Sequence, residues 1–192
     1  YGYSAITDIQ VLCPSRKGDC GTVNLNRALQ AYLNPPGSGK GEHRVGGRVY
    51  RQGDKVMQIK NNYDIVWEKG RETGLGIFNG DVGIICELDN KAHHMVIDFD
   101  ERITEYPMEN IAELELAYAV TVHKSQGSEF EAVVMPVSDA PPQLLYRNLL
   151  YTAVTRAKKL MILVGNPKKL DMMIENNRKN LRYSALQSFL KE

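Results

Sequence analysis

The arrangement of apolar residues changes twice along the chain, and this change restricts the possible folds more than any other feature of the sequence. Residues 9–14 are a short apolar run that ends at a proline, which predicts a strand, and apolar residues then recur at helical spacing over residues 24–33. Residues 132–137 and 160–164 are short apolar runs that also have helical patterns beside them. Because strands that alternate with helices indicate a parallel sheet, both ends of the chain are expected to build one α/β layer.

The middle of the chain has a different pattern. Residues 37–81 are rich in Gly, Lys, Arg and Asn, with one apolar alternation at residues 55–59, and they predict a loop, a strand and a long hairpin. Residues 82–88, 95–99 and 103–106 are rich in β-branched residues and are separated by Asp-Asn and Asp-Glu turn signals. Several short antiparallel strands at this spacing predict a small β-barrel inserted into the α/β layer.

The remaining expected elements lie in the second half of the chain. Residues 142–158 predict a helix, and Asn166 followed by Pro167 predicts the start of another helix after the strand at 160–164. The segment 117–122 fits either a strand or a helix, since its apolar residues satisfy both spacings. This alternative stays open at the level of sequence.

Composition and charge narrow the classes of protein and of site. The chain has 192 residues, of which 43% are hydrophobic, enough for a buried core. Its formal net charge is +1, so a nucleic-acid site must be a local patch rather than the whole surface. The three cysteines form no CxxC pair, which fits neither a disulfide framework nor a zinc site and favours a reducing cytoplasm.

No apolar run is long enough to cross a bilayer, so no membrane partner is expected. The chain begins at Tyr1 rather than at a methionine, which indicates that further sequence, and further motifs, precede it.

The sequence GSGKG at residues 37–41 is similar to the end of a phosphate-binding P-loop but departs from that motif in three ways. Asn34 stands where the first glycine should be, Gly41 replaces the Ser or Thr that binds magnesium, and a helix rather than a strand precedes the segment. We therefore predict a flexible linker here, with Lys40 exposed to solvent.

A polar segment, TVHKSQGSEF, occupies residues 121–130 between two apolar runs. Thr121 and His123 can donate hydrogen bonds to phosphate oxygens, Gly127 allows a ligand to approach the backbone, and Glu129 can accept from a ribose hydroxyl. A solvated turn is the alternative interpretation.

A second cluster, LLYTAVTRAKK, lies at residues 149–159. If the segment is helical, Leu149, Ala153 and Arg156 share one face, which would place the guanidinium of Arg156 beside a packed stripe. A planar, permanently charged guanidinium suits the charge of a γ-phosphate, but an arginine near a helix end can also simply complement the helix dipole.

Residues 117–130 resemble helicase motif V, and residues 151–157 resemble motif VI, both of the kind found in RecD-like superfamily 1 DNA helicases, the family of the exodeoxyribonuclease V alpha subunit. Their order along the chain also matches. Further similarity to RecD-like sequences is found at residues 10–18 with 25–30, and at residues 53–58 through 78–83, so the resemblance covers about residues 9–165.

The resemblance implies an α/β fold in which a RecA-like domain of the P-loop NTPase type, called 2A and lacking its own P-loop, is split by a small SH3-like barrel, called 2B. Residues 1–45 and 113–192 would form 2A, and residues 46–112 would form 2B.

Family roles carried over to this chain give a set of candidate site residues. Arg156 would be the catalytic arginine that contacts the γ-phosphate, with Gly127 and Glu129 bordering the nucleotide. Thr121 and His123 would contact single-stranded DNA, and the barrel would guide the strand with Lys60, Asn61, Asn62 and Asn79. No metal ligand is expected in this chain.

The implied activity is that of the carboxy-terminal motor half of an ATP-dependent DNA helicase, which moves 5′ to 3′ on single-stranded DNA and unwinds duplex. ATP with Mg²⁺ is the implied cofactor, and the Walker motifs that bind it would lie in a missing amino-terminal motor domain. This chain alone is therefore expected to hydrolyse no ATP and to bind DNA weakly. The implied partners are single-stranded DNA, that motor domain and other recombination subunits.

Two other classes share these features: a non-enzymatic module that binds single-stranded nucleic acid through the barrel, and the helicase domain of a conjugative relaxase or a Pif1-like protein. The segment FNGDVG at residues 78–83 favours the RecD-like branch. A protein interaction domain without a nucleotide role is a third alternative.

Overall fold

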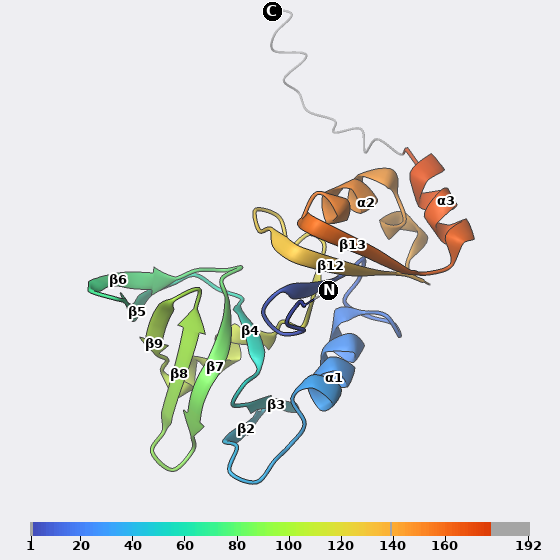
Figure 1. Cartoon of the computed structure of the whole chain (residues 1–192). Helices are drawn as coiled ribbons and strands as arrows, with labels where there is room; N and C mark the ends of the chain where they lie inside the picture. Colours follow the sequence, from blue (N-terminus) through green and yellow to red (C-terminus); the bar gives the residue numbers. More distant parts are fainter. Residues whose placement is uncertain (1, 139, 178–192) are drawn as a thin grey trace, which may run out of the picture.

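A parallel four-stranded sheet forms one layer of the structure, a computed structural model that describes residues 2–138 and 140–177 (Figure 1). The strand order is β11-β1-β12-β13, and every neighbouring pair is parallel. The strands are β1 (Ile9–Cys13), β11 (Ala119–Thr121), β12 (Phe130–Val137) and β13 (Ala157–Gly165). The predicted parallel α/β layer is confirmed, and the segment left open at 117–122 contains a strand.

Three α-helices accompany this sheet in the described part of the chain: α1 (Thr22–Leu33), α2 (Arg147–Val154) and α3 (Pro167–Glu175). A short 3-10 helix, η2 (Pro142–Leu144), precedes α2. The predicted start of α3 is confirmed, since the Asn166 side chain accepts a hydrogen bond from the backbone N–H of Lys168 at 3.0 Å.

The helix predicted over residues 142–158 is too long. Helix α2 ends at Val154, and strand β13 already begins at Ala157, so Arg156 lies in the turn between them. Pairing with β12 explains the early end, because the N–H of Phe130 donates to the carbonyl of Arg156 and Phe130 is in register with Ala157. The sequence pattern suggested that a helical Arg156 would share a face with Leu149 and Ala153. Because Arg156 lies beyond the end of α2, it does not.

Helix α1 faces the sheet with polar side chains. Its buried residues are Thr22, Asn26 and Gln30, whereas Tyr32, which the sequence pattern places in the apolar stripe, is 85% exposed. Two of these polar side chains bond to the backbone of neighbouring segments: Asn26 to both the N–H and the carbonyl of Ala119 at 2.8 Å, and Gln30 to the carbonyl of Val49 at 2.8 Å.

The second layer is an antiparallel seven-stranded sheet with the order β10-β4-β7-β8-β9-β5-β6 (Figure 1). Its strands are β4 (Lys55–Gln58), β5 (Asn62–Lys69), β6 (Glu72–Ile77), β7 (Val82–Asp89), β8 (His94–Phe99), β9 (Arg102–Glu105) and β10 (Leu114–Leu116). A 3-10 helix, η1 (Met108–Glu113), precedes β10. The predicted antiparallel insert is thus present between α1 and β11. The sheet includes β10, beyond residue 112.

One hairpin was not predicted. Strands β2 (Glu42–Val45) and β3 (Arg48–Arg51) pair with each other where the sequence suggested only a loop. The alternation of charged and apolar residues is too short here to predict strands. Two glycines, Gly46 and Gly47, form the turn with positive φ values of 54° and 75°. Nearby, Lys40 is exposed as expected, although it donates to the side-chain oxygen of Asn34.

The two layers are joined by shared packing and by one buried carboxylate. Met57 from β4 belongs to the hydrophobic core of the parallel sheet. Asp54, fully buried just before β4, accepts hydrogen bonds from three side chains that belong to the α/β layer: those of Gln30 at 2.6 Å, Asn34 at 2.7 Å and Tyr118 at 2.9 Å. Burial raises the pKa of Asp54, and these hydrogen bonds act against that shift.

Within residues 2–138 and 140–177, no helix combines the length and the hydropathy needed to span a membrane.

Candidate nucleotide and nucleic-acid site

The polar segment 121–129 begins at the end of β11 and forms a turn-rich loop that returns to β12. The hydroxyl of Ser125, which is buried, donates to the carbonyl of Val122 at 2.8 Å and closes the loop from inside. Gly127 has a φ of +90°, and a Cβ at this position would meet nothing within 4 Å. The loop therefore requires glycine for its backbone conformation, and it leaves open space beside that backbone.

Replacement of Gly127 by alanine is expected to strain this loop without creating a steric clash. Because an L-residue in the left-handed region costs about 1–2 kcal/mol, Gly127→Ala should lower the free energy of unfolding by that amount. Gly37→Ala is the matched control, since Gly37 lies outside the left-handed region and its nearest contact is the Lys40 side chain at 3.8 Å. Chemical denaturation of both variants measures the difference, and equal stability of the two would contradict the expectation.

Arg156 lies against the same loop. One terminal nitrogen of its guanidinium donates to the carbonyl of Ser128 at 3.0 Å, and the other is 3.4 Å from the hydroxyl of Thr155. Its Nε is buried and has no hydrogen-bond partner, and none of the described carboxylates forms an ion pair with it. The structure therefore brings Arg156 next to Gly127 and Glu129 and leaves part of its donor capacity unused.

The other predicted residues of this loop differ in exposure. Glu129, Gly127 and His123 are exposed, whereas Thr121 is partly buried. The Nε2 of His123 lies 3.4 Å from the hydroxyl of Tyr146, which precedes α2. One polar group of the loop, His123, and one from the α2 region, Tyr146, therefore lie close together.

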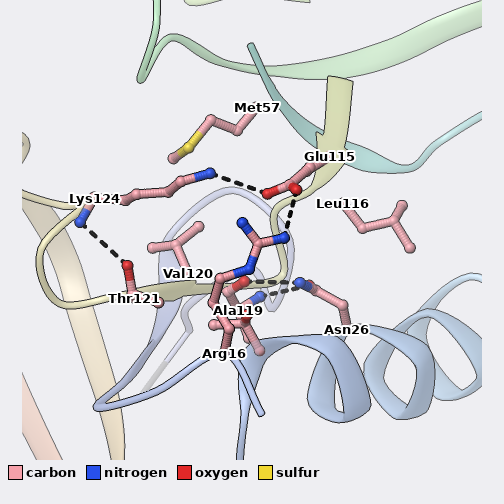
Figure 2. Close-up of a pocket in the computed structure, with 10 residues that line it drawn as sticks. Arg16, Asn26, Met57, Glu115, Leu116, Ala119, Val120, Thr121 and Lys124 are labelled. Carbon is pink, nitrogen blue, oxygen red and sulfur yellow. Dashed lines mark hydrogen bonds and ion pairs between the residues drawn. The ribbon is translucent and has the colours of Figure 1, made fainter. Parts of the chain in front are cut away.

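A small cavity lies at the Thr121 end of the loop (Figure 2). Its polar lining includes Arg16, from the loop after β1, and Lys124, from the loop after β11. Both donate to the carboxylate of Glu115, Arg16 at 2.7 Å and Lys124 at 3.0 Å. Burial raises the pKa of Glu115, but the bonds from Lys124 and Arg16 outweigh this, so the pKa lies below its ordinary value and the carboxylate stays charged.

The barrel residues predicted to guide DNA lie in two neighbouring turns. The side chain of Asn61 accepts from the N–H of Asn79 at 3.0 Å, which joins the β4–β5 and β6–β7 turns. Lys60, Asn61 and Asn79 are exposed, but Asn62 is half-buried and donates to Glu113 at 3.0 Å. Asn62 is thus bonded to the 3-10 helix η1, whereas the side chain of Asn61 is bonded to the β6–β7 turn.

An aromatic pair beside these turns was not predicted. The rings of Tyr63 and Phe78 meet edge to face with centroids 5.5 Å apart, and their side chains are 65% and 39% exposed. Arg16, Glu115 and Lys124 were also missed. The sequence signal for Arg16 was its place in the segment 10–18, and nothing in the sequence paired it with Glu115, which lies about a hundred positions away in the chain.

Two family models match the chain. Residues 25–99 match the SH3 domain of ATP-dependent RecD-like DNA helicases, and residues 116–164 match the UvrD-like helicase C-terminal domain. The first range contains the antiparallel insert up to β8, and the second contains β11, β12, α2, Arg156 and most of β13.

Curated proteins with similar sequences are also RecD proteins. The chain is 37% identical to the ATP-dependent RecD2 DNA helicase of Deinococcus radiodurans over 82% of its length, and 29% identical to the RecBCD enzyme subunit RecD of Mycolicibacterium smegmatis over 98%. It spans only 20% and 30% of the lengths of these relatives.

Solved structures of low sequence identity share the fold. A Pif1 helicase from Bacteroides in complex with ADP-AlF3 and single-stranded DNA superimposes with a TM-score of 0.55 at 18% identity, over 100% of this chain and 46% of the other. The Pif1 helicase from Candida albicans superimposes with a TM-score of 0.54 at 16% identity, over 100% of this chain and 50% of the other. These structures show the fold alone, whereas the RecD2 relative at 37% identity and the two family models show that the chain belongs to the RecD-like helicases and carries their SH3 domain and a UvrD-like C-terminal domain.

Proposed function

We propose that the chain is the 2A motor lobe, with its 2B barrel, of an ATP-dependent DNA helicase that moves 5′ to 3′ along single-stranded DNA. In this proposal residues 1–45 and 113–192 belong to 2A, of which residues 1, 139 and 178–192 lie outside the described part of the chain, and residues 46–112 belong to 2B. The observation that carries it is the position of Arg156, whose guanidinium lies against the Ser128 carbonyl beside the exposed Glu129, without a carboxylate partner among the described residues.

The nucleotide would bind between this lobe and a second one. Arg156 fits the γ-phosphate of ATP, because its guanidinium has five N–H donors and only two of its nitrogens have a protein partner among the described residues. The open space at Gly127 allows a ligand close to the backbone, and the exposed carboxylate of Glu129 can accept from a ribose hydroxyl. Mg²⁺ would be held with the nucleotide by residues outside this chain.

The single strand would run past Thr121 and His123. The hydroxyl of Thr121 accepts weakly from the N–H of Lys124 at 3.4 Å, which leaves its proton free for a phosphate oxygen. His123 is exposed and can donate to the same backbone. Lys60, Asn61 and Asn79 would contact the strand from the barrel, whereas we propose no direct contact for Asn62, given its bond to Glu113.

Arg156, Thr121 and His123 then have distinct roles in one cycle of ATP hydrolysis. ATP hydrolysis supplies the free energy. Arg156 approaches the γ-phosphate when the lobes close and stabilises the charge that develops there, while Thr121 and His123 hold the strand. When the lobes reopen, Arg156 withdraws, and the alternation between grip and release advances the protein along DNA. Other recombination subunits are proposed as partners by analogy with RecD in the RecBCD enzyme.

The expected division of labour can be tested with the isolated chain. Because the second nucleotide-binding surface would lie outside it, the 192-residue chain should fold, hydrolyse no ATP and bind single-stranded DNA weakly, whereas the full-length protein should hydrolyse ATP and bind DNA tightly. ATP turnover by the isolated chain that Arg156→Ala abolishes would contradict this. Strong, salt-dependent binding of single-stranded DNA by the isolated chain would instead favour a binding module.

A further inference from the structure

A groove of about 330 Å³ runs between helix α1 and the β2–β3 hairpin, and the proposed nucleotide and DNA contacts do not use it. Its described walls carry four arginines, Arg16, Arg27, Arg48 and Arg51, and a single acidic residue, Glu115. Such a concentration of positive charge is local, because the whole chain has a formal net charge of only +1. The groove therefore favours an anionic ligand.

The ion pairs inside the groove leave positive charge uncompensated. Glu115 accepts from Arg16 at 2.7 Å and Arg48 at 3.4 Å, and also from Lys124 at 3.0 Å, so one carboxylate faces three cations. Arg51 pairs with Glu42. Arg27 is exposed on α1, and among the described residues no carboxylate pairs with it.

Two of these arginines are held in place. Arg48 also donates to the carbonyl of Leu114 at 3.2 Å, so its guanidinium is fixed at the wall formed by β3 and β10. Arg16 is held by Glu115, and Figure 2 shows this pair beside Lys124 and Asn26. Helix α1 adds no negative charge, since its sequence TVNLNRALQAYL has no acidic residue.

The groove continues the cavity at Thr121. The two hollows share Arg16, Glu115 and three further lining residues, Thr22, Asn26 and Leu116. A chain-like ligand that contacts Thr121 can therefore extend past Arg16 into the groove. The groove also offers apolar surface from Val23, Ala31 and Val49 between its charges, which a ligand with apolar as well as charged parts can use and a small free anion cannot.

We propose that this groove binds the continuation of the single strand beyond Thr121, with Arg27 and Arg48 contacting successive phosphates. The inference rests on the proposed function, because it extends the strand that Thr121 and His123 hold. An acidic protein segment is the other class of ligand that the same charges could bind, and competition with polyglutamate separates the two.

The test measures binding of the full-length protein to oligothymidylates of about 6 and about 16 nucleotides by fluorescence anisotropy at several salt concentrations. The short oligonucleotide reaches only the Thr121 site, and the long one also reaches the groove. For Arg27→Gln combined with Arg48→Gln, affinity for the long oligonucleotide should fall. The negative slope of log affinity against log salt should become shallower by about 1.4, since each lost phosphate contact removes about 0.7 from its steepness. Affinity for the short oligonucleotide should not change.

Arg71→Gln is the matched control, because Arg71 is an exposed arginine in the β5–β6 turn and does not line the groove. Arg27→Gln alone is the second variant, since Arg27 is exposed and pairs with no carboxylate in the described part of the chain, so its loss should not unfold the protein. This single variant should make the negative slope of log affinity against log salt shallower by about 0.7, half the change expected for the double variant.

Failure of the groove proposal and failure of the helicase proposal give different results. Unchanged binding of the long oligonucleotide by both variants would overturn the groove proposal and leave the helicase proposal intact. Absence of binding to either oligonucleotide by the unmodified protein would overturn both. Binding of polyglutamate that requires Arg27 and Arg48 and displaces no DNA would assign the groove to an acidic protein segment instead.

Discussion

Arg156→Ala in the full-length protein is expected to reduce DNA-stimulated ATP turnover by about a thousandfold or more, the effect of removing an arginine that stabilises a transferring γ-phosphate. The guanidinium already lies at the loop that contains Gly127 and Glu129, held by a single carbonyl at 3.0 Å and by a weak contact with Thr155. Arg156→Lys should recover little, because an ammonium cannot present the planar pair of donors.

A loss of activity is informative only if the fold and DNA binding survive. Arg147→Ala is the matched control, since Arg147 also donates to a backbone carbonyl, that of Ile174, but lies at the start of α2 rather than beside Ser128. Both variants should keep the affinity of the unmodified protein for single-stranded DNA. Steady-state turnover measures the effect. Arg156→Ala with ATP turnover equal to that of Arg147→Ala would remove Arg156 from the nucleotide site.

Asp54→Ala is expected to lower the free energy of unfolding by about 3 kcal/mol, a larger loss than Gly127→Ala should cause. The carboxylate is fully buried and accepts from Gln30, Asn34, Tyr118 and the N–H of Arg51. A buried donor left without an acceptor costs about 1–3 kcal/mol. The amides of Gln30 and Asn34 keep carbonyl partners, so Tyr118 and Arg51 should account for most of the loss.

In a protein of this size the change corresponds to a fall in melting temperature of about 6–12 °C. Asp54→Asn should lose less, because it keeps one acceptor oxygen and carries no charge. Burial disfavours the charge of Asp54, which is why it raises the pKa of that carboxyl. Asp64→Ala is the control, an exposed carboxylate on β5 whose removal should change stability by less than about 0.5 kcal/mol. If Asp54→Ala melted like Asp64→Ala, the buried carboxylate would not hold the two layers together.

The sequence predicted the elements whose patterns are long or have clear end signals. The strand over residues 9–14 and the capped helix after Asn166 follow from local rules, and so does the alternation of strands and helices that gives the parallel sheet. Helix α2 was overextended because good helix formers continue to Lys158, whereas the pairing of Ala157 with Phe130 ends the helix. Tertiary pairing of this kind is invisible in a local pattern.

The burial of α1 could not be read from its leucines. Its leucines suggested an apolar face, but β11 is an edge strand whose buried Ala119 has no strand partner on its outer side within the described residues, and Asn26 bonds to the N–H and the carbonyl of Ala119 instead. The polar stripe of Thr22, Asn26 and Gln30 at intervals of four residues was the available signal. The groove arginines were missed for a related reason, since they come from separate segments that only the fold brings together.

The helicase proposal is tested most directly by strand separation. The full-length protein would be mixed with ATP and a labelled duplex carrying a single-stranded tail on either its 5′ or its 3′ side, with fluorescence reporting the release of one strand. Release from the 5′-tailed duplex that needs ATP hydrolysis and is lost in Arg156→Ala is the expected result. Failure to release either duplex, together with tight salt-dependent binding of single strands by the chain alone, would contradict a motor and leave a binding module.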